Sequence, residues 1–524
     1  MIENEKDGVA LKVFYNIRKV YSGLRTITIS LINNNKKTSS SNSPTEHHFF
    51  QPEIIVKKPV DGSFYPIEQQ SKFNIDIDSK IEELQYRSIK TYSRGHSCSG
   101  DWNQKDDNLD KSVTRVYSNL FPNYEVKGTA QRKDPFNSEN SLSTFFNTFS
   151  NINLPLDENK INIIKILRSF LKDYKDWNQK LVNEASHLDK KYNEASEKVI
   201  EDCKNAYLRI EKGIDFLEKN NNALSAFIIA NRAIWFQQCH FNLQNRSIKG
   251  QFFNPSNDIL NKEYSSRGWR PFQLAFILMN IYTIPTDENS NPENSDDVEL
   301  IWFPTGGGKT EAYLGLAAFS IVYNRLIGSR KTYGVEVIMR YTLRLLTSQQ
   351  FQRASTMICA LDYIRSSENL NKIDASQFSN SNELSIGLWV GRSLTPNTNK
   401  DAVKKKQELE STGNNPFQIL SCPWCKTSLE NPLGEENPTY DGYQRKSVKG
   451  QTEVVFQCHE DQCFYYGKYL PIYVVDEQLY TKLPTILIGT VDKFAQLSWR
   501  QEPRKFFGLE NVIKPPSLII QDEL

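Results

Sequence analysis

The sequence predicts an α/β fold built on a parallel sheet, and three observations carry this prediction. From about Gly268 onward, short β-branched runs alternate with helical patterns, as in chains whose parallel strands are joined by helices. One of these runs leads straight into a glycine-rich loop. Two pairs of cysteines interrupt the alternation with the spacing of a small metal-binding insertion. The predicted strands are residues 300–303, 335–339, 386–390, 485–488 and 518–520.

Length and composition describe an ordinary globular protein. The chain has 524 residues, which is enough for roughly two to four domains that each bury a core. Hydrophobic residues make up 38% and charged residues 24%, which excludes wholesale disorder. The formal net charge of +2 neither supports nor excludes a nucleic-acid partner, which would have to meet a local basic groove.

Nothing in the sequence predicts secretion or a membrane anchor. Residues 1–8 are polar with no apolar stretch behind them, so no secretory signal is predicted. The longest apolar stretch, 224–236, is broken by Asn231 and Arg232 and is too short to cross a bilayer. We therefore expect a cytoplasmic location and no membrane partner. In a reducing cytoplasm, the eight cysteines are expected to be thiols or metal ligands rather than disulfides.

The half of the chain before the predicted sheet divides into two parts. Residues 1–155 are expected to form an α+β region with a disordered insertion near 33–46, where Asn, Ser, Thr and Lys predominate. Apolar residues recur at steps of four and three from Ile163 to Val199, which predicts a long helix packed against 223–238. We interpret 156–250 as a helical domain, with a core function favoured over a partner-binding arm. Polar composition also predicts loops at 285–297 and 366–383.

The glycine-rich loop has the spacing and context of a phosphate-binding loop. It follows the predicted strand 300–303 and precedes a predicted helix at 311–326. Glycines let backbone N–H groups converge on a β-phosphate at a helix N-terminus, where the helix dipole also favours anions. Lys309 would add positive charge across the β- and γ-phosphates, and Thr310 would bind Mg²⁺. A chance glycine-rich turn is the alternative, which the flanking strand and helix disfavour. The predicted ATP-binding residues here are Thr305, Gly306, Gly307, Gly308, Lys309 and Thr310.

Two further motifs fit the same nucleotide site. Gln273 lies 36 residues before Lys309, and its amide offers the donor and acceptor that an adenine edge requires. Alone this position is a weak signal. Asp522 and Glu523 follow the predicted strand 518–520, where an Asp can hold Mg²⁺ through water and a Glu can polarise the attacking water. A similar Val-Val-Asp-Glu string at 474–477 precedes another strand, and we set it aside.

The two pairs of cysteines predict a zinc ribbon inserted at residues 415–470. The second pair is spaced by four residues rather than two, and His459 lies inside it as a possible substitute ligand. A redox dithiol is the alternative for the first pair, but it leaves the second pair unexplained. Cys98, Cys203, Cys239 and Cys359 are isolated in sequence and are interpreted as buried thiols. The predicted zinc ligands are Cys422, Cys425, Cys458 and Cys463.

Taken together, these motifs resemble the large helicases of the DISARM bacterial anti-phage systems, which belong to superfamily 2. The matching segments cover about half of the chain, and residues 94–99 and 230–233 are similar more loosely. The closely matching segments are residues 303–311, 341–350, 422–425, 489–495 and 521–524.

The resemblance implies a fold, a reaction and a set of partners. It implies that 265–524 is an incomplete RecA-like lobe, the first of two. Thr342 and Arg344, with Thr490 and Lys493, would contact the phosphate backbone of DNA without reading its sequence. The DNA would be a single strand or a duplex end, and ATP hydrolysis would drive translocation along it or its remodelling. Other defence-system subunits are the remaining expected partners.

The resemblance also sets limits on what this chain would do alone. A family member continues past residue 524 into a second RecA-like lobe that carries an arginine finger, so we expect little DNA-stimulated ATPase activity from this chain by itself. One alternative is a DNA- or partner-binding module that does not turn over ATP. Another is a structural subunit for which nucleotide is only a folding ligand.

Overall fold

The chain forms two compact units in the computed structural model. The first contains Met1–Gly128 and Leu188–Val199, and the second contains Thr129–His187 and Ile200–Leu524. The structure describes residues 2–6, 9–19, 24–34, 48–67, 76–103, 113–122, 143–242, 268–284, 298–302, 307–328, 334–342, 344–391, 394–430, 440–448, 450–509 and 514–522.

In the part of the chain that the structure describes, Met1–Gly128 of the first unit contains two small antiparallel sheets and one helix. In the first sheet, β1 (Ile2–Lys6), β2 (Val9–Lys19) and β3 (Arg25–Asn33) lie in chain order. In the second, β6 (Arg115–Asn119) lies between β4 (Ile55–Lys57) and β5 (Ser99–Trp102).

The helix of the first unit, α1 (Ile77–Gln85), begins after Asp76, whose carboxylate accepts a hydrogen bond from the Ser79 backbone N–H. Mixed strands and helix agree with the α+β prediction for this part of the chain. Of the predicted disordered insertion at 33–46, only Asn33 and Asn34 are described, and the rest lies outside the described residues.

The second unit includes the helices α2 (Ser143–Phe149), α3 (Leu156–Ala185) and α5 (Asn221–Asn242), together with α4 (Asn193–Lys219) from residue 200 onward. The prediction of one long helix through the heptad stripe was wrong. The chain breaks after Ala185, and a short 3₁₀ turn, η3 (Lys190–Tyr192), precedes α4.

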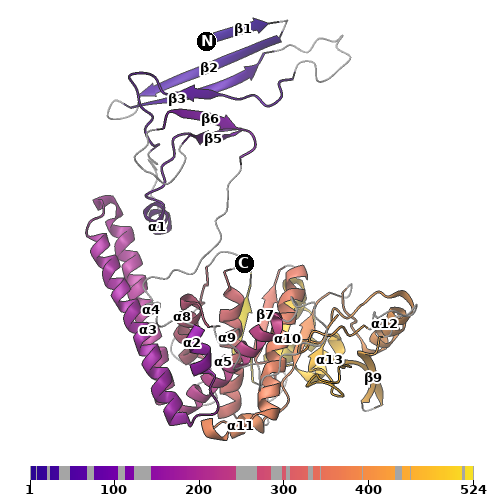
Figure 1. Cartoon of the computed structure of the whole chain (residues 1–524). Coiled ribbons are helices and arrows are strands. Elements are labelled where there is room, and N and C mark those ends of the chain that lie inside the picture. Colours follow the sequence, from indigo (N-terminus) through magenta and orange to yellow (C-terminus); the bar gives the residue numbers. More distant parts are fainter. Residues whose placement is uncertain are drawn as a thin grey trace. The chain divides into compact units, whose positions relative to one another are not determined.

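The heptad spacing did not reveal this break because the apolar residues at the start of α4 continue the same steps of four and three as those on α3. The two helices run antiparallel (Figure 1), and Arg168 on α3 pairs with Asp215 and Glu218 on α4 at 2.5 and 2.6 Å.

Helix α5 is buried on every side over most of its length. Its residues 223–237 are all buried, as expected for a helix that is apolar all round. It packs against α9 (Lys309–Ile327) and α10 (Arg344–Ser367), which cover the parallel sheet. Helices before and after residue 250 therefore share one hydrophobic core.

Among the described residues, the parallel sheet has five strands in the order β11-β8-β12-β7-β13, and every neighbouring pair is parallel. This confirms the α/β prediction and four of the five predicted strands. Their bounds are β7 Val337–Tyr341, β8 Ile386–Trp389, β11 Ile472–Tyr473, β12 Ile486–Thr490 and β13 Leu518–Gln521.

Both faces of this sheet are covered, because side chains alternate between two hydrophobic clusters. On one face Val337, Ile486 and Ile488 join the large core that includes α5, α9 and α10. On the other face Ile338 and Leu487 join a smaller cluster formed with α13 (Asp476–Lys482), α14 (Val491–Phe494) and the 3₁₀ segment η8 (Glu502–Phe507). Parallel sheets are normally covered on both sides in this way.

Two local predictions were wrong. Residues 300–302 are described but form no strand, and Leu300 and Trp302 are 71% and 82% exposed. A short apolar run becomes a strand only where it finds a ladder partner, and these described residues pair with none. Residues 366–383, predicted as a loop, contain η6 (Asn371–Ile373) and α11 (Ser376–Ser379), because Ile373 and Phe378 are buried in the core. The other predicted loop, 285–297, lies outside the described residues.

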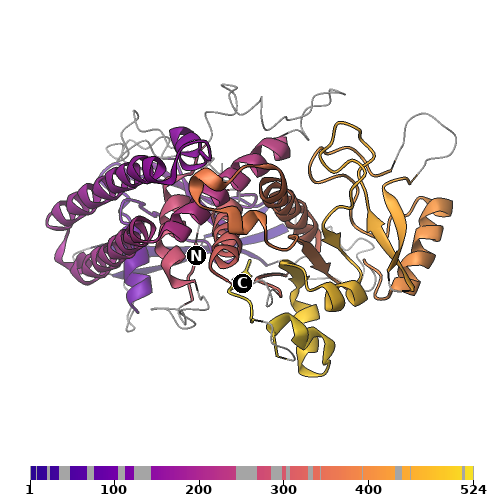
Figure 2. The same cartoon turned by 90° about the horizontal axis from the view of Figure 1, so that it is seen from below.

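The cysteine-containing insertion lies at one end of the second unit, with α12 (Asn399–Thr412) beside it (Figure 2). Its hairpin consists of β9 (Tyr443–Val448) and β10 (Gln451–Phe456), and α12 packs on β10. Across the part of the chain that the structure describes, no helix is long and apolar enough to span a bilayer.

Candidate functional site

The described part of the phosphate-binding loop enters a long buried helix. Helix α9 begins at Lys309, two residues before the predicted start at 311, and Gly308 precedes it with φ at 92°. This left-handed backbone explains the glycine, since other residues are strained there. A Cβ atom at Gly308 would also lie 2.8 Å from Nε2 of Gln273. Residues 303–306, which include the predicted ligands Thr305 and Gly306, lie outside the described residues.

Tyr313 joins two of the predicted catalytic residues. Its hydroxyl donates to the carboxylate of Asp522 at 2.9 Å, and it lies within hydrogen-bond distance of Oγ1 of Thr310 at 3.1 Å and of the hydroxyl of Tyr341 at 3.2 Å. Burial, together with Tyr341 and Asp522, raises the pKa of Tyr313, so the hydroxyl stays a neutral donor. Thr310 and Asp522, far apart in sequence, therefore lie at one place. Glu523 is outside the described residues.

The sequence analysis missed Tyr313, although one signal was available. Tyr313 follows Thr310 by three residues on α9, and residues three apart share a helix face. On the other side, the Asp522 backbone N–H donates to the carbonyl of Arg340 at 3.0 Å, which continues the β13–β7 ladder. The site thus lies at the carboxyl ends of two parallel strands, where open α/β sheets bind ligands.

Gln273 contacts the phosphate-binding loop directly. It lies in the first turn of α8 (Pro271–Asn280), and its amide donates to the Gly308 carbonyl at 2.7 Å. The amide oxygen accepts from the Arg270 backbone N–H at 2.7 Å, and the Arg270 guanidinium donates to the Gly307 carbonyl. Both ends of the Gln273 amide are therefore engaged. An adenine edge would have to replace these two hydrogen bonds.

The four predicted nucleic-acid contacts lie in different environments. Thr342 is exposed directly after β7, while Arg344 begins α10 with its side chain outside the described part. Thr490 is buried at the end of β12. Lys493 is also buried, and its ammonium lies 2.6 Å from the carboxylate of Asp476, in the 474–477 string set aside above. A phosphate contact by the Lys493 side chain would require breaking that ion pair.

The four predicted zinc ligands converge on one point. Their sulfur atoms all lie within 4.8 Å of one another, with 3.9 Å between Cys422 and Cys463 and 3.5 Å between Cys425 and Cys458. A tetrahedral zinc site with bonds of about 2.3 Å needs sulfurs about 3.8 Å apart. The donor set and its dimensions fit zinc. Hydrogen bonds from the neighbouring thiols, Cys422 first, hold the pKa of Cys425 far below its usual range.

Polar and aromatic groups surround the four cysteines of the candidate metal site. The Tyr465 backbone N–H donates to Sγ of Cys463, and the partly buried Lys426 donates a hydrogen bond to Thr356 on α10 at 2.9 Å. Trp424 lies between the two cysteines of the first pair and stacks on Tyr363 and His240, with ring centroids 5.1 and 3.8 Å apart. His459 is not part of the ligand cluster. The redox alternative is disfavoured, since the second pair completes the site.

Comparison with curated proteins finds a relative along most of the chain. The chain is 32% identical over 496 residues to the DISARM protein DrmA of Bacillus paralicheniformis (strain ATCC 9945a / NCIMB 11709 / CD-2), and the alignment takes in 85% of this chain. The chain belongs to the DrmA-like DISARM proteins. This confirms the resemblance inferred from the motifs. The aligned part is 41% of the length of that DrmA protein, and no protein-family model matches the chain.

The DrmA-like alignment is long enough to include most of both halves of the chain, so the relationship does not depend on the phosphate-binding loop alone.

The isolated cysteines of this DrmA-like chain do not belong to a metal-binding cluster among the described residues. Cys239 and Cys359 are buried, while Cys98 and Cys203 are partly exposed. The interpretation as buried thiols therefore holds for two of the four.

Proposed function

We propose that this chain is the nucleotide-binding part of an ATP-dependent nucleic-acid translocase or helicase of superfamily 2, acting in anti-phage defence. The observation that carries the proposal is the hydrogen-bonded group of Thr310, Tyr313 and Asp522. The sequence analysis assigned the phosphate-binding loop and the acidic motif at 522–523 to one site for phosphate and Mg²⁺. In the structure the Tyr313 hydroxyl links Thr310 of the loop to Asp522 of the acidic motif. Membership of the DrmA-like proteins supports the defence function and further DISARM subunits as partners.

The arrangement of the sheet supports a RecA-like lobe. All five strands are parallel, helices cover both faces, and the loop-to-helix turn and Asp522 lie at the carboxyl ends. The N-terminus of α9 directs backbone N–H groups and a positive dipole end toward an anion. In this proposal Lys309 binds the β- and γ-phosphates of ATP.

Mg²⁺ would be held by the Thr310 hydroxyl and the Asp522 carboxylate, both in reach of Tyr313. When bound, Mg²⁺ neutralises charge on the phosphates. Tyr313 positions these two groups because its hydroxyl donates to Asp522 and hydrogen-bonds Thr310, so neither has to be ordered at the moment of binding. Glu523 would polarise the attacking water. Thr342 and the start of α10 would contact the phosphate backbone of DNA as a single strand or duplex end.

The test is ATP binding to the full chain by calorimetry, with Lys309→Ala as the test variant. Lys404→Ala is the matched control, because Lys404 is a largely exposed lysine on α12. We expect Lys309→Ala to lose most of the affinity for Mg²⁺-ATP while Lys404→Ala keeps it. Equal affinity in all three proteins would overturn the nucleotide site.

DNA stimulation of ATP turnover is the second measurement, made on the chain together with a second RecA-like lobe supplied in trans or in a longer protein. Single-stranded DNA should raise turnover in the parent and not in Lys309→Ala. Robust ATP binding without any turnover in that complete form would favour a DNA- or partner-binding module with a structural zinc ribbon.

A further inference from the structure

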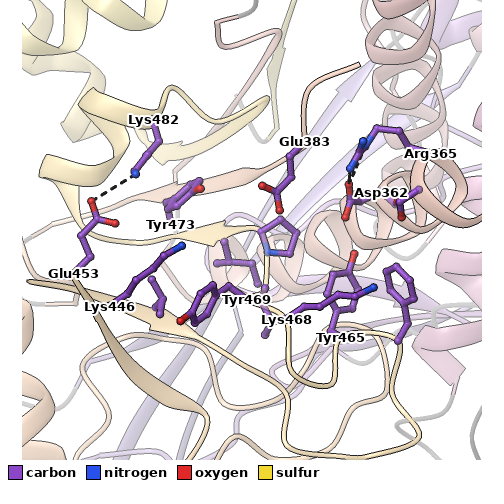
Figure 3. Close-up of a pocket in the computed structure, with 16 residues that line it drawn as sticks. Asp362, Arg365, Glu383, Lys446, Glu453, Tyr465, Lys468, Tyr469, Tyr473 and Lys482 are labelled. Atoms are coloured by element: carbon purple, nitrogen blue, oxygen red, sulfur yellow. Dashed lines mark hydrogen bonds and ion pairs between the residues drawn. The ribbon is translucent and has the colours of Figure 1, made fainter. Parts of the chain in front are cut away.

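A cavity of about 320 Å³ lies between the zinc ribbon and the parallel sheet, away from the proposed ATP site. Its walls come from α10, the β9–β10 hairpin, the segment 464–473 and the end of α13 (Figure 3). Glu383 lies before β8, and Ile472 begins β11, so the cavity is at the amino ends of the strands. Asp522 lies after β13, at the opposite end of the sheet.

Some of the charged side chains that line the cavity form ion pairs with each other, and two lysines do not. Asp362 pairs with Arg365 at 2.7 Å, and Glu453 pairs with Lys482 at 3.6 Å. Lys446 and Lys468 are different: in the described part of the chain no carboxylate lies within ion-pair distance of either ammonium. Each lies over an aromatic ring instead, Lys446 at 4.4 Å from the centre of Tyr469 and Lys468 at 3.7 Å from that of Phe464.

One carboxylate faces these lysines from the opposite wall. Figure 3 shows the Glu383 carboxylate directed into the cavity from above, and among the described residues it forms no hydrogen bond or ion pair. Partial burial and the nearby Asp362 raise the pKa of Glu383, while Arg365 and Lys446 oppose this shift. Tyr473 lies on the same wall, half-buried, between Glu383 and Glu453.

These groups define the ligand by its chemistry. Two unpaired ammonium groups at the mouth suit a phosphate. Tyrosine rings suit a planar aromatic ring, and an unpaired carboxylate suits an amino group on the edge of that ring. The volume is at the small end of the range for ligand sites, roughly 300–1,000 Å³, which limits the ligand to about one such unit.

We propose that this cavity binds one nucleotide whose base carries an exocyclic amino group, with Glu383 accepting from that amino group and Lys446 and Lys468 binding the phosphates. The nucleotide is either free or part of a single strand; only the second source rests on the proposed function. A strand held here would lie at the ribbon, at the opposite end of the parallel strands from the ATP site. The ribbon would then be a nucleic-acid contact as well as a metal site.

The test uses the full chain carrying Lys309→Ala, so that the proposed ATP site does not contribute, and four probes. These are dCMP, dTMP and fluorescent hexamers of deoxycytidine and of deoxythymidine, since thymine lacks the amino group. Binding is followed by calorimetry for the mononucleotides and by anisotropy for the hexamers. We expect Lys446→Glu with Lys468→Glu to weaken binding of the cytidine probes roughly tenfold or more.

The control is Lys404→Glu on α12, outside the cavity, which should bind as the parent does. Glu383→Ala should reduce the preference for cytidine over thymidine probes. Equal binding of dCMP and its hexamer would identify a free nucleotide as the ligand, and binding of the hexamer alone would identify a strand.

Unchanged cytidine binding in the double Lys→Glu variant would overturn the proposal, provided that its thermal unfolding matches the parent. Capture of an acidic peptide with no nucleotide binding would also overturn it. Neither outcome bears on ATP binding at Lys309, which is measured separately in the parent, so the two proposals fail independently.

Discussion

The Lys493 ammonium lies 2.6 Å from the Asp476 carboxylate, with only 4% and 3% of the two side chains exposed. Lys493 belongs to α14, directly after β12, and also lies over the ring of Trp389. Asp476 begins α13, which packs against the same face of the sheet. Burial raises the pKa of Asp476, and Lys493 opposes that shift. The pair therefore joins two short helices beneath the sheet.

Breaking this pair should destabilise the chain. We expect Lys493→Met to lower the free energy of unfolding by about 3–5 kcal/mol, because it leaves the Asp476 carboxylate buried without its cation. The double variant Lys493→Met with Asp476→Leu should recover much of that loss. Urea denaturation of the parent and the variants measures both effects, and Lys404→Met is the exposed control. A single variant as stable as the parent would contradict the importance of the pair.

The Tyr313 hydroxyl should matter for Mg²⁺-dependent binding. We expect Tyr313→Phe to weaken binding of Mg²⁺-ATP roughly tenfold, the effect of about one hydrogen bond to a charged group. Binding of ATP without Mg²⁺ should change little, because Lys309 and the backbone of the loop remain. Calorimetry with and without Mg²⁺ separates the two. Equal losses in both conditions would indicate a packing defect instead.

The purified chain should contain one zinc ion. Cys422→Ser combined with Cys463→Ser should abolish zinc binding and loosen residues 415–470, since metal binding supplies on the order of 10 kcal/mol to small ribbons. Elemental analysis measures the metal, and hydrogen exchange measures the loosening. Cys203→Ser is the control, because Cys203 lies on α4, outside the cluster. Freshly purified protein without zinc would refute the site.

Trp424 should contribute to stability without being needed for the metal. Its ring is buried against α5 and α10, so Trp424→Ala should cost about 3–5 kcal/mol through the cavity it leaves. The four sulfurs are unchanged, and zinc content should remain at one per chain. Denaturation measures the loss of stability, and elemental analysis of the same sample measures the zinc content. Loss of zinc in this variant would show that docking of the ribbon and metal binding are inseparable.

Glu336 should make stability depend on pH. Burial raises the pKa of Glu336 from 4.5 to about 7, although Arg325 lies 2.9 Å away and opposes the shift. The folded state therefore binds more protons than the unfolded state between these values. This contribution is fully present below about pH 4.5 and is lost as the pH rises through about 7.

Glu336→Gln should remove that part of the pH dependence. The free energy of unfolding of the variant, relative to that of the parent, should rise between pH 5 and pH 8. The altered contact with Arg325 adds a difference that does not change with pH. Thermal unfolding at several pH values measures the trend. A difference that stays constant with pH would contradict a raised pKa.

Much of the site could be predicted from the sequence because its chemistry is local. The loop before α9 needs consecutive glycines, a lysine and a threonine in one stretch, and the ribbon needs cysteines at fixed spacing. Tyr313 was missed because an aromatic residue on a helix is ordinarily part of a core. Its hydroxyl contacts Asp522, more than two hundred residues later, and only the sheet brings the two together.

By itself, the sequence determined the α/β class, four strands of the parallel sheet, helix α9 and the four cysteines of the metal cluster. Each depends on periodicity or spacing within one segment, which a single stretch of chain expresses fully. Only the tertiary structure decided which polar groups are free to bind a ligand and which are already paired inside the protein. Lys493 is a basic residue in a segment predicted to contact nucleic acid, yet its ammonium is buried in an ion pair with Asp476. Lys446 and Lys468 stand in no motif, yet they remain without carboxylate partners in the described cavity wall, because desolvation and pairing depend on neighbours from distant parts of the chain.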